Sequence, residues 1–319
     1  MRYASLVTAL IILIGCGSAA AQSYPARPVR IIVPFAPGGG LDVTARLISP
    51  KLSESLGWPV VVENRPGAGG AIGLELAARA TPDGHTMAIL SASHLIQDIL
   101  GKSRFDFRRD FAPLSEVLAS PYVFAVYPGL PVKTVSELVA YAKSHAGKLN
   151  YVSAGNGTLQ QLSMELFNQA VGVKIVEVPY KGLGPAYPDI FAGRVQMMMS
   201  SLASLAPHIR AKRLHALAVT SSARAPVLPE LPTMVEAGVP GFIVAQWQGL
   251  VMPAATPAAI VERVQREVAK ALRYPDIAAF LANDGAQAVG SSPKQFRSSL
   301  EADRKKWAKV VQQAGIRAR

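Results

Sequence analysis

A strand that runs directly into a glycine-rich loop and then a helix most constrains the fold of this chain. In RIIVPFAPGGGLDVTAR (30–46), residues 30–33 predict a short strand, and the apolar spacing from Leu41 predicts a helix that ends at Gly57. Two prolines and three consecutive glycines separate these elements and end the strand. Such a junction directs free backbone N–H groups and the positive end of the helix dipole at one place, which predicts a small anion site.

The same arrangement recurs along the chain. A strand at 59–63 leads into NRPGAGG (64–70), and a strand at 150–153 leads into AGNG (154–157); each loop is followed by a helical pattern. Further strands are predicted at 86–90, 122–127, 174–178, 195–199, 214–220 and 247–252. Alternating strands and helices with short connections predict a mostly parallel sheet, here in two α/β halves with a ligand cleft between them.

The first 21 residues predict a signal peptide, with Arg2, an apolar run at 4–14 and the small residues 19–21 before Gln22. We therefore expect an exported, periplasmic protein that is released in soluble form. The alternative is a lipid anchor at Cys16, because LIGC (13–16) resembles a lipoprotein processing box. Cleavage after residue 21 leaves no cysteine, which excludes a disulfide scaffold and a thiol nucleophile from the mature chain.

Composition and motif spacing exclude several other classes. The net charge is +12, but the basic residues are spread along the chain, so we expect solvated helix faces and no nucleic-acid partner. No loop fits the spacing of a P-loop or of a dinucleotide fingerprint. No metal-ligand spacing and no nucleophile–base motif is present either, so we expect no metal, no cofactor and no enzymatic activity.

Two residues keep a structural and a functional interpretation at this stage. Asp42 lies in the first turn of the helix after the glycines, where it could cap the helix and support the loop, or contact a ligand hydroxyl or amine. Trp247 could line the cleft or pack in the core. Each glycine loop taken alone could also be an ordinary strand-to-helix turn.

A set of motifs in one order resembles the Bug family, the TctC-type periplasmic receptors of tripartite tricarboxylate transporters. The resemblance covers essentially the whole mature chain and rests on VPFAPGGGLD (33–42), VENRPGAGGAIG (62–73), PDGHT (82–86), DFAPLS (110–115), NYVSAGNGT (150–158), PYKG (179–182), LAVTS (217–221), LPTMVEAGVPGF (231–242), WQGLVMPAATP (247–257) and WAKVVQQAGI (307–316). It implies an α/β, two-domain type II periplasmic-binding-protein-like fold. The expected domains are 22–121 plus 249–319, and 122–248, with the ligand cleft between them.

The resemblance also implies where a ligand would bind. It places a small carboxylate between a first-domain loop and a facing loop in the second domain. Residues beside these loops are weaker candidates. The candidates are Phe35, Ala36, Pro37, Gly38, Gly39 and Asp42; Ser153, Ala154, Gly155, Gly157 and Thr158; and Ser91, Ser93, Lys181, Gly182 and Ser200.

One position departs from the family pattern. Many relatives carry an Asp where this chain has Ser200, and another acidic residue where it has Gln196. Loss of these acids disfavours an amino-acid ligand and favours a solute with an uncharged end or an additional carboxyl group. The expected protein is a monomer that passes its solute to integral membrane transporter subunits or to a sensor. An enzyme on the same scaffold, or a signalling protein that binds no ligand, remains the alternative.

Overall fold

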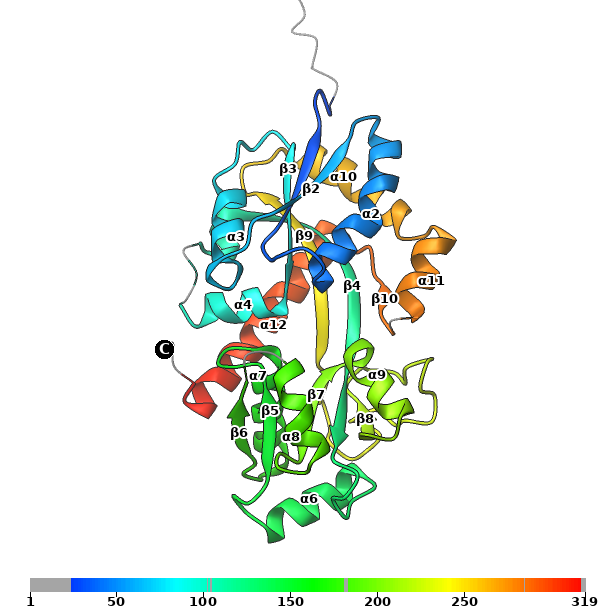
Figure 1. The fold of residues 1–319 in the computed structure, drawn as a ribbon. Helices are drawn as coiled ribbons and strands as arrows, with labels where there is room; N and C mark the ends of the chain where they lie inside the picture. Colours follow the sequence, from blue (N-terminus) through cyan, green and yellow to red (C-terminus); the bar gives the residue numbers. More distant parts are fainter. Residues whose placement is uncertain (1–23, 102, 104, 181–182, 284, 317–319) are drawn as a thin grey trace, which may run out of the picture.

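The computed structural model describes residues 24–101, 103, 105–180, 183–283 and 285–316 (Figure 1). The predicted signal peptide with Cys16, and the candidate residues Lys181 and Gly182, lie outside the described residues.

Two α/β lobes lie one above the other, each built around its own set of mainly parallel strands (Figure 1). In the upper lobe β1 (Val29–Val33) pairs in parallel with both β2 (Val60–Asn64) and β3 (Thr86–Ser91). In the lower lobe β5 (Asn150–Ser153) pairs in parallel with both β6 (Val176–Pro179) and β7 (Met197–Ser201). The expectation of two α/β halves is confirmed.

Two long antiparallel strands, β4 (Phe111–Val126) and β9 (Ala245–Pro253), lie between these sets. They pair with each other from Phe111↔Pro253 to Pro121↔Ala245. From Tyr122 onward β4 pairs instead with β7 of the lower lobe, and also with β8 (His215–Val219). A single strand is therefore shared by both lobes, and the expected domain boundaries lie inside β4 and β9. The sequence predicted only the last part of β4, from Tyr122 onward.

Helices cover both lobes (Figure 1). The upper-lobe helices are α2 (Gly40–Leu56), α3 (Ala71–Ala78), α4 (Ala92–Ile99), α5 (Phe107–Asp110), α10 (Ala258–Ala271) and α11 (Pro275–Asn283). The lower-lobe helices are α6 (Val135–Ser144), α7 (Leu159–Val171), α8 (Tyr187–Phe191) and α9 (Leu202–Arg210). Short 3-10 turns occur at η1 (Ala68–Gly70) and η2 (Gly184–Ala186), and β10 (Gln287–Ala288) pairs with β4.

The last helix, α12 (Pro293–Ala314), packs against both lobes, because it contacts α4 and β4 above and α7 below. Its start is set by a capping box, in which Ser292 and Gln295 satisfy each other's backbone N–H groups. Trp307 of this helix is 1% exposed and belongs to a hydrophobic cluster that includes residues of both lobes. Burial of this face holds α12 behind the two long strands.

The rear of β9 is tightly packed against α12. Trp247 is buried, stacks edge-on against Phe296 at 5.5 Å between ring centroids, and donates from Nε1 to Asp303 Oδ2 at 2.7 Å. A Cβ atom added at Gly249 would collide with the ring of Phe296. Of the two interpretations of Trp247, the structure shows core packing.

We predict that Gly249→Ala destabilises the protein by about 1–3 kcal/mol, because the added methyl group overpacks the contact with Phe296. Urea unfolding followed by circular dichroism measures this change. Gly184→Ala is the matched control, because a Cβ there meets no atom within 4 Å. Equal unfolding free energies for the two variants would contradict the packing argument.

Candidate functional site

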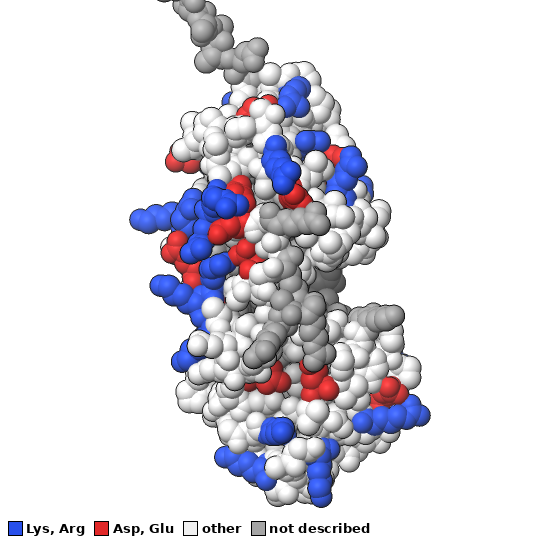
Figure 2. All heavy atoms as spheres, turned by 90° about the vertical axis from the view of Figure 1, so that its left-hand side faces the viewer, with Lys and Arg blue, Asp and Glu red and all other residues white. Residues whose placement is uncertain are grey.

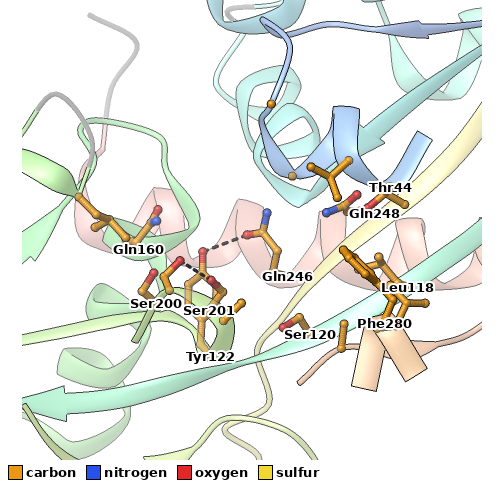
Figure 3. A pocket seen from close by; sticks show the side chains of 18 residues that line it. Thr44, Leu118, Ser120, Tyr122, Gln160, Ser200, Ser201, Gln246, Gln248 and Phe280 are labelled. Carbon is orange, nitrogen blue, oxygen red and sulfur yellow. Dashed lines mark hydrogen bonds between the residues drawn. The ribbon is translucent and has the colours of Figure 1, made fainter. Parts of the chain in front are cut away.

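A cavity of about 450 Å³ lies between the two lobes (Figure 3). Residues from both lobes and from the long strands β4 and β9 form its walls. They are Gly38, Gly40, Val43, Thr44, Leu118, Ser120, Tyr122, Gln160, Leu183, Ser200, Ser201, Ala203, Ser204, Gln246, Gln248, Phe280, Leu281 and Ala286. Its volume is within the range of small-molecule sites.

The floor of the cavity is one face of the β4–β9 ribbon. Side chains alternate between faces along a strand, so Leu118, Ser120 and Tyr122 of β4 share a face with Gln246 and Gln248 of β9. Trp247 points to the opposite face, toward α12. The face of the ribbon that forms the cavity floor is therefore mainly polar, whereas the opposite face, against α12, is mainly apolar.

One hydrogen bond orients a side chain of this floor. The Tyr122 hydroxyl donates to Gln246 Oε1 at 3.0 Å, as the dashed line in Figure 3 shows. The amide NH₂ of Gln246 is then left to face other groups in the cavity. Burial raises the pKa of Tyr122, so its hydroxyl remains protonated and able to donate.

The upper wall is the start of α2. Gly39 is the N-cap, no side chain caps it, and the first helical hydrogen bond runs from Val43 N to Gly39 O at 2.9 Å. The N–H groups of the first turn therefore lack helical partners, as at any helix start. Gly38 and Gly40 bring this end of the helix to the cavity without side chains of their own.

Asp42 supports this loop from behind. It is 3% exposed and its carboxylate accepts from Gly38 N at 2.9 Å, from Arg46 Nε at 3.0 Å and from Asn64 Nδ2 at 2.9 Å. The bond from Arg46 is the main cause that lowers the pKa of Asp42 to about 2. Asn64 also donates to Phe35 O at 3.1 Å. This set of bonds supports the loop interpretation of Asp42, and its carboxylate is not among the groups that line the cavity.

The lower wall is the junction of β7 with α9. Ser200 and Ser201 end the strand, and Ala203 and Ser204 lie in the first turn of α9. Ser201 is the N-cap of α9; its hydroxyl hydrogen-bonds with Ser204 Oγ at 2.8 Å.

The lobes touch on both sides of the cavity. On one side Gly285 lies against the side chain of Leu202, so closely that an added Cβ would collide with it. On the other side a Cβ at Gly157 would lie 2.7 Å from Leu100 Cδ1. These contacts join α9 to the α11–β10 connection and the α7 loop to the end of α4. The cavity is consequently held between lobes that are in contact.

The structure brings two of the predicted site residues together in this cavity, Gly38 and Ser200. Phe35 packs against the ring of His94, with 5.2 Å between centroids. The other residues of the first loop, Ala36, Pro37 and Gly39, are exposed beside Gly38 but do not line the cavity.

The serines after β3 belong to the start of α4. Ser91 is the N-cap of that helix and is 3% exposed. Its N–H donates to His94 Nδ1 at 3.1 Å, and its hydroxyl lies 3.2 Å from the same atom. Burial lowers the pKa of His94 to about 4, so its ring is neutral at pH 7. Ser93 is half-buried on α4 and, like Ser91, does not line the cavity.

Most residues of the predicted facing loop are engaged in hydrogen bonds within the second lobe. Gly155 N donates to Ser153 Oγ at 3.1 Å, and Gly157 N donates to Gln161 Oε1 at 2.8 Å. Glu177 accepts from Ser153 Oγ at 2.5 Å and from Gln161 Nε2 at 2.8 Å. Thr158 caps α7 and donates to Gly155 O at 2.7 Å; Ala154 is half-buried in the same loop. From this region only Gln160, which was not predicted, reaches the cavity.

Sequence reasoning missed most of the cavity floor and the start of α9. A period-2 pattern could have found the floor, because a buried Trp247 places Gln246 and Gln248 on the other face. The spacing of Leu202, Leu205 and Ile209 could likewise have indicated a helix, although Pro207 interrupts the pattern.

The described residues that line the cavity carry no charged side chain. None of its described lining residues is Asp, Glu, Lys, Arg or His. Within the part of the chain that the structure describes, no group of three or more His, Cys, Asp or Glu side chains could hold a metal ion. No helix among the described residues is long and apolar enough to cross a membrane.

Comparison with known proteins gives one consistent result. A family model described as "Tripartite tricarboxylate transporter family receptor" (TctC) matches residues 44–316. The UPF0065 protein in the tcbD-tcbE intergenic region of Pseudomonas sp. strain P51 is 40% identical over 293 residues, which cover 91% of this chain and 87% of that protein.

Two solved structures extend this result to the fold. Rpa4515 of R. palustris, solved with adipate, is 36% identical with a TM-score of 0.79, covering 92% of this chain and 99% of that chain. The periplasmic binding protein BugD is 32% identical with a TM-score of 0.76, covering 93% of this chain and 100% of that chain. The family resemblance and the two-domain periplasmic-binding-protein fold expected from the sequence are confirmed.

We predict that Asp42→Asn lowers the free energy of unfolding by about 1–2 kcal/mol at pH 7, because the charged acceptor for Gly38, Arg46 and Asn64 is lost. A pKa of about 2 for Asp42 in the folded protein is below the unfolded value of about 3.9, so the stabilisation is present above pH 4. It decreases as the pH falls from about 4 to about 2.

Urea titrations at pH 7, 4 and 3 measure this difference. Asp276→Asn, in the exposed first turn of α11, is the control and changes stability by less than about 0.5 kcal/mol. A deficit of Asp42→Asn that stayed constant between pH 7 and pH 3 would refute the role of the charge.

Proposed function

Because the chain belongs to the TctC family of receptors for tripartite tricarboxylate transporters, we propose that it captures a small carboxylate in the cavity between its lobes. The observation that carries this proposal is the start of α2, which has no side-chain cap and borders the cavity between the two lobes. A helix start in a partly desolvated space favours an anion through its free N–H groups and its dipole.

Neutral donors surround that helix end. Gln248 Nε2 lies 3.5 Å from the position that a Cβ of Gly40 would occupy, and Gln246 is held with its amide NH₂ free of Tyr122. A carboxylate can accept from several such donors at once, and bonds to a charged acceptor are stronger than neutral ones. The adipate in Rpa4515 supports the same class of ligand for this chain.

The lining of the cavity is better suited to ligand binding than to catalysis. The described residues that line the cavity include no carboxylate, amine or imidazole, and burial keeps the Tyr122 hydroxyl protonated, so general acid–base chemistry has no evident partner there. Binding alone needs only the neutral donors and a cavity that excludes water.

The same proposal includes release to a membrane partner. The lobes would open about the long strands β4 and β9, where β4 changes its partner between Pro121 and Tyr122. The signal peptide would send the protein to the periplasm as a soluble monomer. There the loaded form would dock on transporter subunits in the membrane, or alternatively on a sensor.

A binding panel tests the ligand class. Isothermal titration calorimetry with mono-, di- and tricarboxylates should give saturable binding of at least one acid, with an increase in the unfolding midpoint. Native mass spectrometry of protein purified from its source should show a co-purified acid. Absence of binding across the panel, with a folded protein, would refute the proposal.

We predict that Gly40→Val weakens binding of the best acid at least tenfold, because the side chain would project beside Gln248 at the carboxylate position. The fold should survive, since the contact of an added Cβ is an ordinary 3.5 Å. Ala258→Val, at the exposed first position of α10, is the control with the same side chain at a helix start. Wild-type affinity in Gly40→Val would exclude this end of α2 as the site.

A further inference from the structure

We propose that His94 is a positioning residue for the start of α2, because it holds the loop that leads from β1 into that helix. This inference rests on the proposed function, and it names a residue that determines how well the binding site is formed. His94 lies in the first turn of α4, is 1% exposed and does not line the cavity.

Three segments that each follow a parallel strand of the upper lobe meet at the imidazole ring of His94. The ring of Phe35, two residues after β1, lies 5.2 Å from it between centroids. Gly70, in the loop after β2, lies so close that an added Cβ would collide with His94 Nε2. Ser91, the last residue of β3, donates from its N–H to His94 Nδ1 at 3.1 Å. One buried side chain therefore touches the junctions that follow β1, β2 and β3.

A hydrogen bond fixes the orientation of the ring. Because the Ser91 N–H is a donor, Nδ1 is the acceptor, and the proton of the neutral ring lies on Nε2. Burial lowers the pKa of His94 to about 4, so the ring keeps this form at pH 7. The same bond is part of the capping box of α4 and ties the ring to the end of β3.

From this position the ring supports the loop after β1. Gly70 lies between His94 and Pro34, since an added Cβ would be 2.5 Å from His94 Nε2 and 3.3 Å from Pro34 Cβ. The ring of Phe35 packs against the imidazole itself. Pro34 and Phe35 lead directly to Gly38–Gly40, where α2 begins. A displacement of these two residues would move the helix start relative to the cavity.

Stability alone does not account for a histidine at this position. Among the described residues, Nε2 of His94 has no hydrogen-bond partner, although it is buried and carries the proton. A buried N–H group without a partner destabilises a fold, and native proteins accept such costs at functional sites. The contacts that the ring makes to the loops are the gain that offsets this cost.

Charged side chains near these loops are paired with one another. On the face that Figure 2 shows, basic and acidic side chains lie close together over the upper lobe. Arg65 pairs with Glu63 beside the second loop, and Arg79 pairs with Glu75 on α3. None of the residues named above as neighbours of the His94 ring is charged. The support of the loop is therefore a matter of packing and of one hydrogen bond.

Such positioning changes the affinity for a ligand without any contact to it. A ligand binds only the fraction of molecules in which the site is formed, so the apparent dissociation constant rises as that fraction falls. A loop that already has its bound shape in the free protein also loses less conformational entropy on binding. His94 would act through both effects.

A double-mutant cycle tests whether His94 acts through Phe35. His94→Asn removes the ring but keeps an acceptor for the Ser91 N–H, so α4 should remain capped and the variant folded. Phe35→Ala removes the other half of the ring contact. We expect each single variant to bind the best acid of the panel about tenfold more weakly than the wild type. The double variant should lose no more than about threefold beyond the weaker of the two.

Independent effects would instead multiply to a loss of about a hundredfold, and that result would overturn the inference. Wild-type affinity in His94→Asn would overturn it as well. Affinities are measured below the unfolding midpoint of every variant, so that each comparison is between folded proteins.

Amide hydrogen exchange of the ligand-free protein reports on the loop itself. In His94→Asn the amides of residues 36–43 should exchange at least about fivefold faster than in the wild type. Val135→Ala, which removes buried methyl groups from α6 in the lower lobe, is the control for a general loss of stability and should leave this segment unchanged. Unchanged exchange in His94→Asn would refute the role of the ring. If the wild type binds no acid, the proposed function fails, whereas exchange still decides whether His94 holds the loop.

Discussion

The architecture depends on the pairing of β4 with β9, because these strands separate two environments and also join two lobes. Alternation of side chains sends Ser120, Tyr122, Gln246 and Gln248 into the cavity, and sends Trp247 backward onto α12. The tight contact of Phe296 with Gly249 holds this ribbon from behind. A shift of one residue in register would exchange the polar floor for the apolar rear, so the packing of α12 also positions the site.

In the proposed site, backbone dipoles would take the part that lysine or arginine has in other anion sites. Asp42 contributes by holding the loop through Gly38, and it faces away from the cavity with Arg46 and Asn64 around it. A negative side chain near a carboxylate site would normally oppose binding. Here Arg46 compensates the charge of Asp42, so the positive end of the α2 dipole remains the dominant local field. A site built in this way avoids the desolvation cost of a cationic side chain.

Local pattern revealed the strand–loop–helix junctions, because glycines, prolines and apolar spacing are themselves local signals. The junction at Gly38–Gly40 was found in this way, and the family motifs gave the two-domain fold. Other features depend on residues far apart in the chain. The N–H groups of Gly155 and Gly157 are engaged through Ser153 and Gln161, which are both held by Glu177 on the next strand. The continuity of β4 through Pro121 depends on β9, more than a hundred residues later.

The starts of α2 and α9 differ in whether an acidic side chain lies in the first helical turn. At α2 the acid, Asp42, lies in the first turn but is turned inward to the loop. At α9 the corresponding turn holds Ser204, and the preceding strand ends in Ser200 and Ser201. An acid at the end of β7 would place a negative charge beside the positive end of the α9 dipole and offset it. Such an acid would suit a cationic group on the solute. Serine leaves that dipole without an opposing charge, so the local field at the end of β7 differs from the field that an acidic side chain would produce there.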